Sequence, residues 1–184
     1  MTAPENLCPL WVFGYGSLIW NPGFPVAEQA IAMLSGYRRG FCMSSIHHRG
    51  SVEAPGLVLA LDILAGASCH GVAFKVAEGA EADTLATLRE RELISSAYYE
   101  AVIPLDLADG RATQALAYVV DQTHDQYRGD MDLERQAQII AGAQGGRGPN
   151  TEYLWNTVDH LRELGIQDPE LEWLDGRVRA LKRP

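Results

Sequence analysis

The sequence has few of the features that mark membrane-inserted, secreted or metal-binding proteins. No stretch reaches the roughly 18–20 apolar residues of a membrane span, and Met1 to Leu10 lacks the charged start and apolar run of a secretory signal. The three cysteines are odd in number and far apart, so they predict neither a disulfide framework nor a CxxC metal site. Cys8, Cys42 and Cys69 are therefore expected to be packing thiols in a reducing cytoplasm.

Positive charge is also scarce in this chain. Fifteen Lys and Arg face 24 Asp and Glu, a formal net charge of -9, so we expect no nucleic-acid partner and no binding to an anionic membrane surface. A negatively charged small substrate would need local basic groups. With 184 residues, 47% of them hydrophobic, the chain suits one core, and we expect a single domain over residues 1–184.

The first two-thirds of the chain is rich in predicted strands, and no internal repeat or low-complexity linker divides it. A strong hairpin signal, Asp109-Gly110, separates the segments Tyr98–Leu107 and Arg111–Val120. Short apolar or alternating runs predict further strands at Trp11–Tyr15, Gly56–Ile63 and His70–Val76.

Helices are predicted mainly near the end. Asp168 is expected to cap a helix that has Pro169 at its first position, and Asn150 to cap a helix that ends at Gly165. Earlier helices are expected at Met131 to Ala141 and Glu81 to Leu93. Together these segments predict an α+β domain whose sheet is largely antiparallel or closed into a barrel.

One carboxylate falls on the apolar face of the helix predicted at Glu81 to Leu93. Leu85 and Leu88 define that face, and seven residues after Leu85, about two turns, comes Glu92. A carboxylate turned inward must be paired, hydrogen-bonded or protonated, and desolvation would raise its pKa toward the range useful for proton transfer. Alternatively, the helix frays before Glu92, which then pairs with an arginine at the surface.

A glycine-rich turn follows the first predicted strand, in the run Phe13-Gly14-Tyr15-Gly16-Ser17-Leu18. Glycine there permits a positive φ and close backbone approach, and successive N–H groups can bind a carboxylate or a polarised carbonyl. A strand bulge or a tight turn without function is the alternative. The run lacks the Gly-Lys-Ser/Thr of a phosphate loop and the rest of a GxGxxG motif, and Ser17 does not lie in a GxSxG nucleophile elbow.

Two further segments carry basic groups. Gly142 to Gly148 contains Arg147 and precedes a predicted helix, so it predicts either a carboxylate site or a flexible connection. In His47-His48-Arg49, adjacent residues of a strand point to opposite faces, so a metal site is not expected there. Arg49 is a candidate to bind a substrate carboxylate, or else it forms a surface salt bridge.

In their order and spacing over nearly the whole chain, several segments resemble the ChaC-type γ-glutamylcyclotransferases. The segments are Trp11 to Trp20, Gly36-Tyr37-Arg38-Arg39, His48-Arg49-Gly50, Arg91-Glu92-Leu93-Ile94-Ser95 with Tyr98 beyond, and Gly145 to Leu154. The resemblance implies a small β-barrel flanked by α-helices. It also implies conversion of glutathione to 5-oxoproline and cysteinylglycine, without a metal or organic cofactor.

The resemblance also implies roles for single residues. Glu92 is expected to be the catalytic acid and base. Backbone groups of Gly14, Tyr15, Gly16, Ser17 and Leu18 are expected to bind the γ-glutamyl moiety. Tyr98 and Tyr153 are expected to line the pocket.

This chain departs from the family pattern in two places. Phe41 to His47 stands where many relatives carry a longer segment, and Ser95-Ser96-Ala97 replaces a glycine-containing stretch before the tyrosine. Both bear on substrate preference, so cyclisation of other γ-glutamyl amino acids or amines is the alternative activity. A non-catalytic module that binds γ-glutamyl metabolites and an amide hydrolase that uses Ser17 are the other readings.

Overall fold

The computed structural model describes residues 9–93 and 96–183, which form two compact units. Residues 1–39 and 61–121 make the first unit, and residues 40–60 and 122–184 make the second. Two long strands, β2 (Val26–Ser45) and β3 (Gly56–Val76), each contribute residues to both units. One domain over the whole chain stays a prediction.

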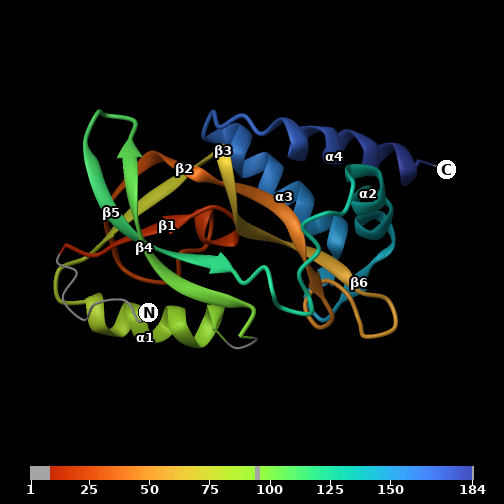
Figure 1. Ribbon diagram of the computed structural model, residues 1–184, viewed down its shortest axis with the longest axis horizontal. Helices are drawn as coiled ribbons and strands as arrows, with labels where there is room; N and C mark the ends of the chain where they lie inside the picture. The colour runs from red at the N-terminus through yellow and green to blue at the C-terminus, as the bar shows by residue number, and fades with distance from the viewer. Residues whose placement is uncertain (1–8, 94–95, 184) are drawn as a thin grey trace. The chain divides into compact units, whose positions relative to one another are not determined.

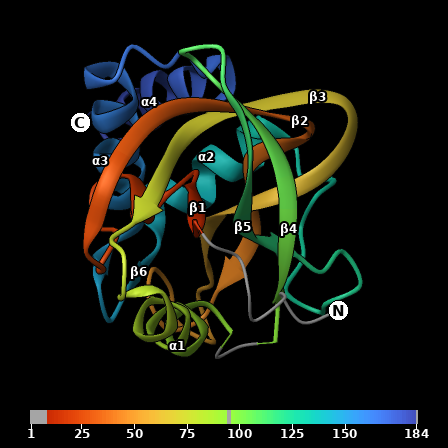
Figure 2. The ribbon, with the colours of Figure 1, turned by 90° about the vertical axis from the view of Figure 1, so that its left-hand side faces the viewer.

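A closed barrel of five strands, in the order β1-β3-β2-β4-β5, confirms the predicted α+β class. β1 (Trp11–Gly14) is antiparallel to β3 and parallel to β5 (Ala112–Val120), where Val12 lies opposite Leu116. β4 (Tyr98–Leu107) and β5 form the predicted hairpin and run side by side in Figure 2. Gly110 has a φ of 88° at its turn, a conformation that glycine adopts without strain. The sequence did not predict β2, and it predicted two short strands where β3 is continuous.

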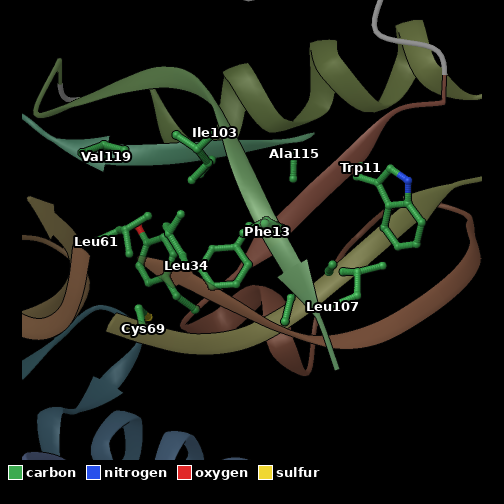
Figure 3. Close-up of a cluster of buried hydrophobic side chains, with 14 residues drawn as sticks. Trp11, Phe13, Leu34, Leu61, Cys69, Ile103, Leu107, Ala115 and Val119 are labelled. Atoms are coloured by element: carbon green, nitrogen blue, oxygen red, sulfur yellow. The ribbon is translucent and has the colours of Figure 1, made fainter. Parts of the chain in front are cut away.

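The first hydrophobic core fills this barrel. Strand alternation turns every second side chain inward, and Figure 3 shows Phe13 and Leu34 among the aliphatic side chains of the neighbouring strands. The buried residues of the core are Trp11, Phe13, Tyr15, Ala32, Leu34, Leu61, Cys69, Ala73, Ile103, Leu105, Leu107, Ala115, Ala117 and Val119.

A second cluster holds α1 (Glu81–Glu92) against the outside of the barrel (Figure 1). Leu88 of this helix is 1% exposed, and Leu85 packs against the same cluster. The strands present the alternate, outward residues to it, because successive side chains of a strand point to opposite faces. The buried members are Leu10, Val12, Leu18, Val76, Leu88, Leu116 and Tyr118.

Three helices form most of the second unit: α2 (Leu133–Gly142), α3 (Asn150–Glu163) and α4 (Pro169–Leu181). Asp168 caps α4 as predicted, by accepting a hydrogen bond from the Leu171 N–H at 3.1 Å. Between α2 and α3 lie two short paired strands, β6 (Gln144–Gly145) and β7 (Gly148–Pro149). None of the described helices is long and apolar enough to cross a membrane.

The predicted role of Asn150 is wrong, because its side chain does not cap α3. Asn150 is fully buried, and its amide accepts from the Leu57 N–H and donates to the Leu57 C=O, both at 2.7 Å. A Cβ atom on the adjacent Gly56 would lie 2.7 Å from the Asn150 Oδ1 and 2.1 Å from the Arg49 carbonyl oxygen. The start of β3 is therefore held by one side chain of α3.

Replacing Asn150 with Ala should lower the free energy of unfolding by about 2–4 kcal/mol, because the Leu57 N–H and C=O would be left buried without partners. Urea denaturation of purified protein measures this. Asn156→Ala, at an exposed position of the same helix, is the control and should change it by less than about 0.5 kcal/mol. Equal effects of the two variants would contradict the assignment.

Candidate active site

In the turn after β1, Gly14 is required because neighbouring atoms leave no room for a Cβ atom, and not because the backbone is left-handed. A Cβ atom at Gly14 would lie 2.9 Å from Phe74 Cε2 and 3.2 Å from Leu18 Cβ, so close packing requires glycine there. The turn does not use the positive φ that glycine permits: neither Gly14 nor Gly16 has one, and Gly16 has a φ of -136°.

Two buried side chains fix this turn to the barrel. The Tyr15 hydroxyl donates to the Tyr118 carbonyl oxygen at 3.1 Å. The Arg39 Nη1 donates to the Tyr15 carbonyl oxygen at 3.1 Å and to the His70 carbonyl oxygen at 2.9 Å. Arg39 is only 5% exposed, so these charge-assisted bonds lie in a low-dielectric setting that strengthens them. The turn is therefore preorganised.

The turn leads into a short 3₁₀ helix, η1 (Ser17–Ile19). Its first internal bond runs from the Ile19 N–H to the Gly16 carbonyl oxygen at 2.9 Å. The Ser17 and Leu18 N–H groups come before that bond and have no acceptor within the helix. They can donate to a carboxylate or to an oxyanion.

Glu92 is the last residue of α1, so the helix extends far enough to place it on the face that carries Leu85 and Leu88. Its side chain is 20% exposed, in agreement with the predicted inward position. The helix does not fray before Glu92, but the alternative was right about one contact: Glu92 Oε1 lies 3.0 Å from Arg91 Nε. The carboxylate is thus half-buried and paired with an arginine.

Arg91 connects the two predicted parts of the site. Its Nη2 donates to the Ser17 hydroxyl at 2.7 Å and its Nη1 to the Asn21 carbonyl oxygen at 2.8 Å, while Nε pairs with Glu92. Sequence reasoning gave Arg91 no role of its own, because the residue before Glu92 projects from a different part of the helix. The signal that could have found it is the polar Ser17 hydroxyl in an otherwise apolar turn.

Tyr98, the first residue of β4, lies on the outer face of the sheet with the cluster that packs under α1. Glu100 and Tyr118 occupy the same face, opposite one another in the β4–β5 register. Burial raises the pKa of Tyr118, and the negative charges of Glu100 and Glu92 raise it further, so its hydroxyl stays protonated. Ile94 and Ser95 of the predicted motif lie outside the described residues.

The structure brings the other two predicted residues together within the second unit. The Arg49 guanidinium carbon lies 5.5 Å from the centre of the Tyr153 ring, a cation–π distance. Its Nη1 also donates to the Pro149 carbonyl oxygen at 3.1 Å and lies 3.7 Å from Glu152 Oε2. Since the Glu152 side chain is 53% exposed, this ion pair is weak and leaves Arg49 able to bind another carboxylate.

The glycine-rich stretch is a structured hairpin and not a flexible connection. The Gly146 N–H donates to the His47 carbonyl oxygen at 2.8 Å, and the Arg147 N–H to the His48 carbonyl oxygen at 2.9 Å. Partial burial lowers the pKa of His48, and the nearby Arg147 lowers it further. No group of three or more His, Cys, Asp or Glu that could hold a metal ion occurs within residues 9–93 and 96–183.

Comparison with known proteins adds family relationships to this geometry. The family of ChaC-like proteins matches residues 10–181. A glutathione-specific γ-glutamylcyclotransferase of Escherichia coli (strain K12) is 37% identical over 173 residues, which cover 94% of this chain and 74% of the relative. Gamma-glutamylcyclotransferase 2-1 of Arabidopsis thaliana is 38% identical over 177 residues, which cover 92% and 82%.

A solved structure supports the fold. The crystal structure of a γ-glutamylcyclotransferase specific to glutathione from yeast matches with a TM-score of 0.83. The match covers 95% of this chain and 99% of that chain at 21% identity, so it shows the shared fold. The barrel and its helices are therefore common to both proteins.

Ser96 offers a test of the departure before β4. It has a φ of 50°, the left-handed region that costs a non-glycine residue about 1 kcal/mol or more. We expect Ser96→Val to be less stable than Ser96→Gly by about 1–2 kcal/mol, because a β-branched side chain fits this conformation worst. Urea midpoints of the two variants measure the difference. Equal midpoints would contradict the left-handed backbone conformation of Ser96.

Proposed function

The chain belongs to the ChaC-like family, and from this we propose that it is a γ-glutamylcyclotransferase that converts glutathione to 5-oxoproline and cysteinylglycine. One observation carries the placement of the chemistry: Arg91 bonds the Ser17 hydroxyl and pairs with the Glu92 carboxylate. A preorganised backbone turn and a half-buried carboxylate are thereby held together by a single side chain.

The reaction is intramolecular, so the substrate supplies both reacting groups. The α-amine of the γ-glutamyl group attacks its own side-chain carbonyl, a new C–N bond closes the five-membered ring, and the amide C–N bond to cysteinylglycine breaks. Because the amine and the carbonyl share one molecule, the protein must supply orientation and proton transfer. No water is consumed, and no step needs a metal or cofactor.

Glu92 is proposed to move the proton. At neutral pH the amine is mostly an ammonium group and cannot attack, so the carboxylate first accepts its proton. The resulting carboxylic acid then donates a proton to the departing amide nitrogen. One half-buried carboxyl group serves both steps, and Arg91 limits how far it can turn.

The turn is proposed to bind the γ-glutamyl moiety through Gly14, Tyr15, Gly16, Ser17 and Leu18. The N–H groups of Ser17 and Leu18 can donate to the oxygen that becomes negative during attack, and their anchored positions require no reorganisation at that moment. Tyr98 remains a proposed pocket residue. Arg49 and Tyr153 remain proposed substrate-binding residues, Arg49 for a substrate carboxylate.

The cytoplasm is the compartment we propose for this activity. Cys42 and Cys69 are free and buried, as expected for packing thiols under reducing conditions. Cys8 lies outside the described residues. A small-molecule substrate suits the family, while the expected lack of a nucleic-acid partner stays a prediction.

Replacing Glu92 with Gln keeps the shape of the side chain and removes the base, so turnover of glutathione should fall by about 10²–10⁴-fold. Mass spectrometry of the products, with chelator-treated protein, measures the reaction. Glu90→Gln, a carboxylate on the same helix turn, is the matched control and should retain activity. Near-normal turnover by Glu92→Gln would refute its role, and wild-type protein that forms no 5-oxoproline would refute glutathione as substrate.

Ser17→Ala separates cyclisation from hydrolysis. If Ser17 only accepts the Arg91 hydrogen bond, its loss should lower kcat/KM by at most about 10–150-fold, which corresponds to the roughly 1.5–3 kcal/mol of one hydrogen bond to a charged group. A serine nucleophile would instead lose nearly all activity. The assay counts free glutamate against 5-oxoproline, and free glutamate from wild-type protein would favour the hydrolase.

A further inference from the structure

A second carboxylate, Glu100 of β4, is buried beside the last turn of α1. Its side chain is 5% exposed, whereas the side chain of its partner Arg89 is 40% exposed. Arg89 Nε donates to Glu100 Oε1 at 2.8 Å and Nη2 to Oε2 at 3.0 Å. Such a two-pronged pair gives both oxygens of the buried carboxylate a charged hydrogen-bond donor.

The Tyr118 hydroxyl of β5 donates to the same carboxylate, reaching Glu100 Oε1 at 3.2 Å. Tyr118 is 1% exposed, and its only hydroxyl proton is used in this bond. The negative charge of Glu92 also contributes to the raised pKa of this phenol. Glu100 and Glu92 therefore both act on Tyr118, but the Tyr118 hydroxyl donates its hydrogen bond to Glu100.

Arg89 also links this cluster to the end of the helix. Its carbonyl oxygen accepts the Leu93 N–H at 3.0 Å, which closes the turn that contains Glu92. Within the described residues, the charged and titratable groups around this turn are Arg89, Glu90 and Arg91 of α1, Tyr98 and Glu100 of β4, and Tyr118 of β5. Besides Glu92 this set holds two carboxylates, and Glu100 is the buried one, whereas Glu90 is exposed.

Resting on the proposed function, we propose that Glu100 is a positioning residue that sets the proton affinity of Glu92. It neutralises Arg89, so that only Arg91 acts on Glu92 as an uncompensated cation, and it keeps the Tyr118 proton from being donated to Glu92. Each effect disfavours the charged form of Glu92 relative to a site without Glu100. The pair thus keeps Glu92 able both to accept and to return a proton.

Replacing Glu100 and replacing Arg89 should shift the pKa of Glu92 in opposite directions. Glu100→Gln removes the negative charge beside Arg89, which favours the Glu92 carboxylate and lowers the pKa of Glu92. The acidic limb of kcat/KM against pH, which reports deprotonation of the base in the free enzyme, should then move to lower pH by about 0.5–1 unit. Arg89→Gln leaves the Glu100 charge unpaired and should move that limb to higher pH by a similar amount.

Two controls separate this effect from general damage. Tyr118→Phe changes no charge, so the limb should stay within about 0.2 unit. Glu134→Gln removes the carboxylate of another two-pronged pair, whose bonds to Arg177 are 2.8 and 2.7 Å long, and should leave the profile unchanged. Circular dichroism confirms that each variant is folded.

Opposite shifts in Glu100→Gln and Arg89→Gln would support the proposal, since loss of packing alone cannot change sign with the charge removed. Shifts in the same direction, or no shift, would overturn it. If Glu100→Gln fails to fold, Arg89→Gln decides alone, because only an upward shift agrees with the proposal. Wild-type protein without 5-oxoproline production would contradict the proposed function instead, while an active wild type with unmoved limbs would contradict this inference only.

Discussion

The arrangement of the first unit depends on alternation along β4 and β5. Every second residue of β4 points into the barrel, where Ile103 and Leu105 join the apolar core. The outward residues of the first half of this strand, Tyr98, Glu100 and Val102, lie beneath α1. Because the same two strands supply both faces, the apolar filling of the barrel and the polar groups beneath the helix are placed by a single register.

This constraint explains why a charged pair occurs in a buried place. An outward position on a small barrel normally faces water, but α1 covers this part of the surface. Glu100 is therefore desolvated and needs Arg89, whose long side chain reaches it while remaining partly exposed. A helix laid over a sheet can thus convert an ordinary outward position into an electrostatic environment with defined charges.

Much of the fold and one key residue could be predicted from the sequence. Helical spacing placed Glu92 inward, turn chemistry gave the β4–β5 hairpin, and the Asp168 cap gave the start of α4, because each is a local signal. The contacts that organise the site could not be predicted this way. Arg91 meets Ser17 across 74 positions of sequence, and Glu100 meets Arg89 only once α1 has packed on the sheet.

Asn150 is a case in which a local sequence signal gave a wrong prediction. An asparagine before a helix is a strong local cap signal, but at this position the side chain satisfies Leu57 instead. Two hydrogen bonds to a buried backbone N–H and C=O are worth more than one bond to an N–H at a helix end. Local rules therefore fail where a buried backbone group elsewhere competes for the same side chain.

This contact has a consequence for the order in which the chain is made. Leu57 leaves the ribosome 93 residues before Asn150, the side chain that completes its hydrogen bonding. All strands of the barrel have been synthesised by residue 120, yet the first residues of β3 still lack their partner at that point. During synthesis, water must solvate the Leu57 amide and carbonyl, and the start of β3 becomes fixed only when α3 arrives.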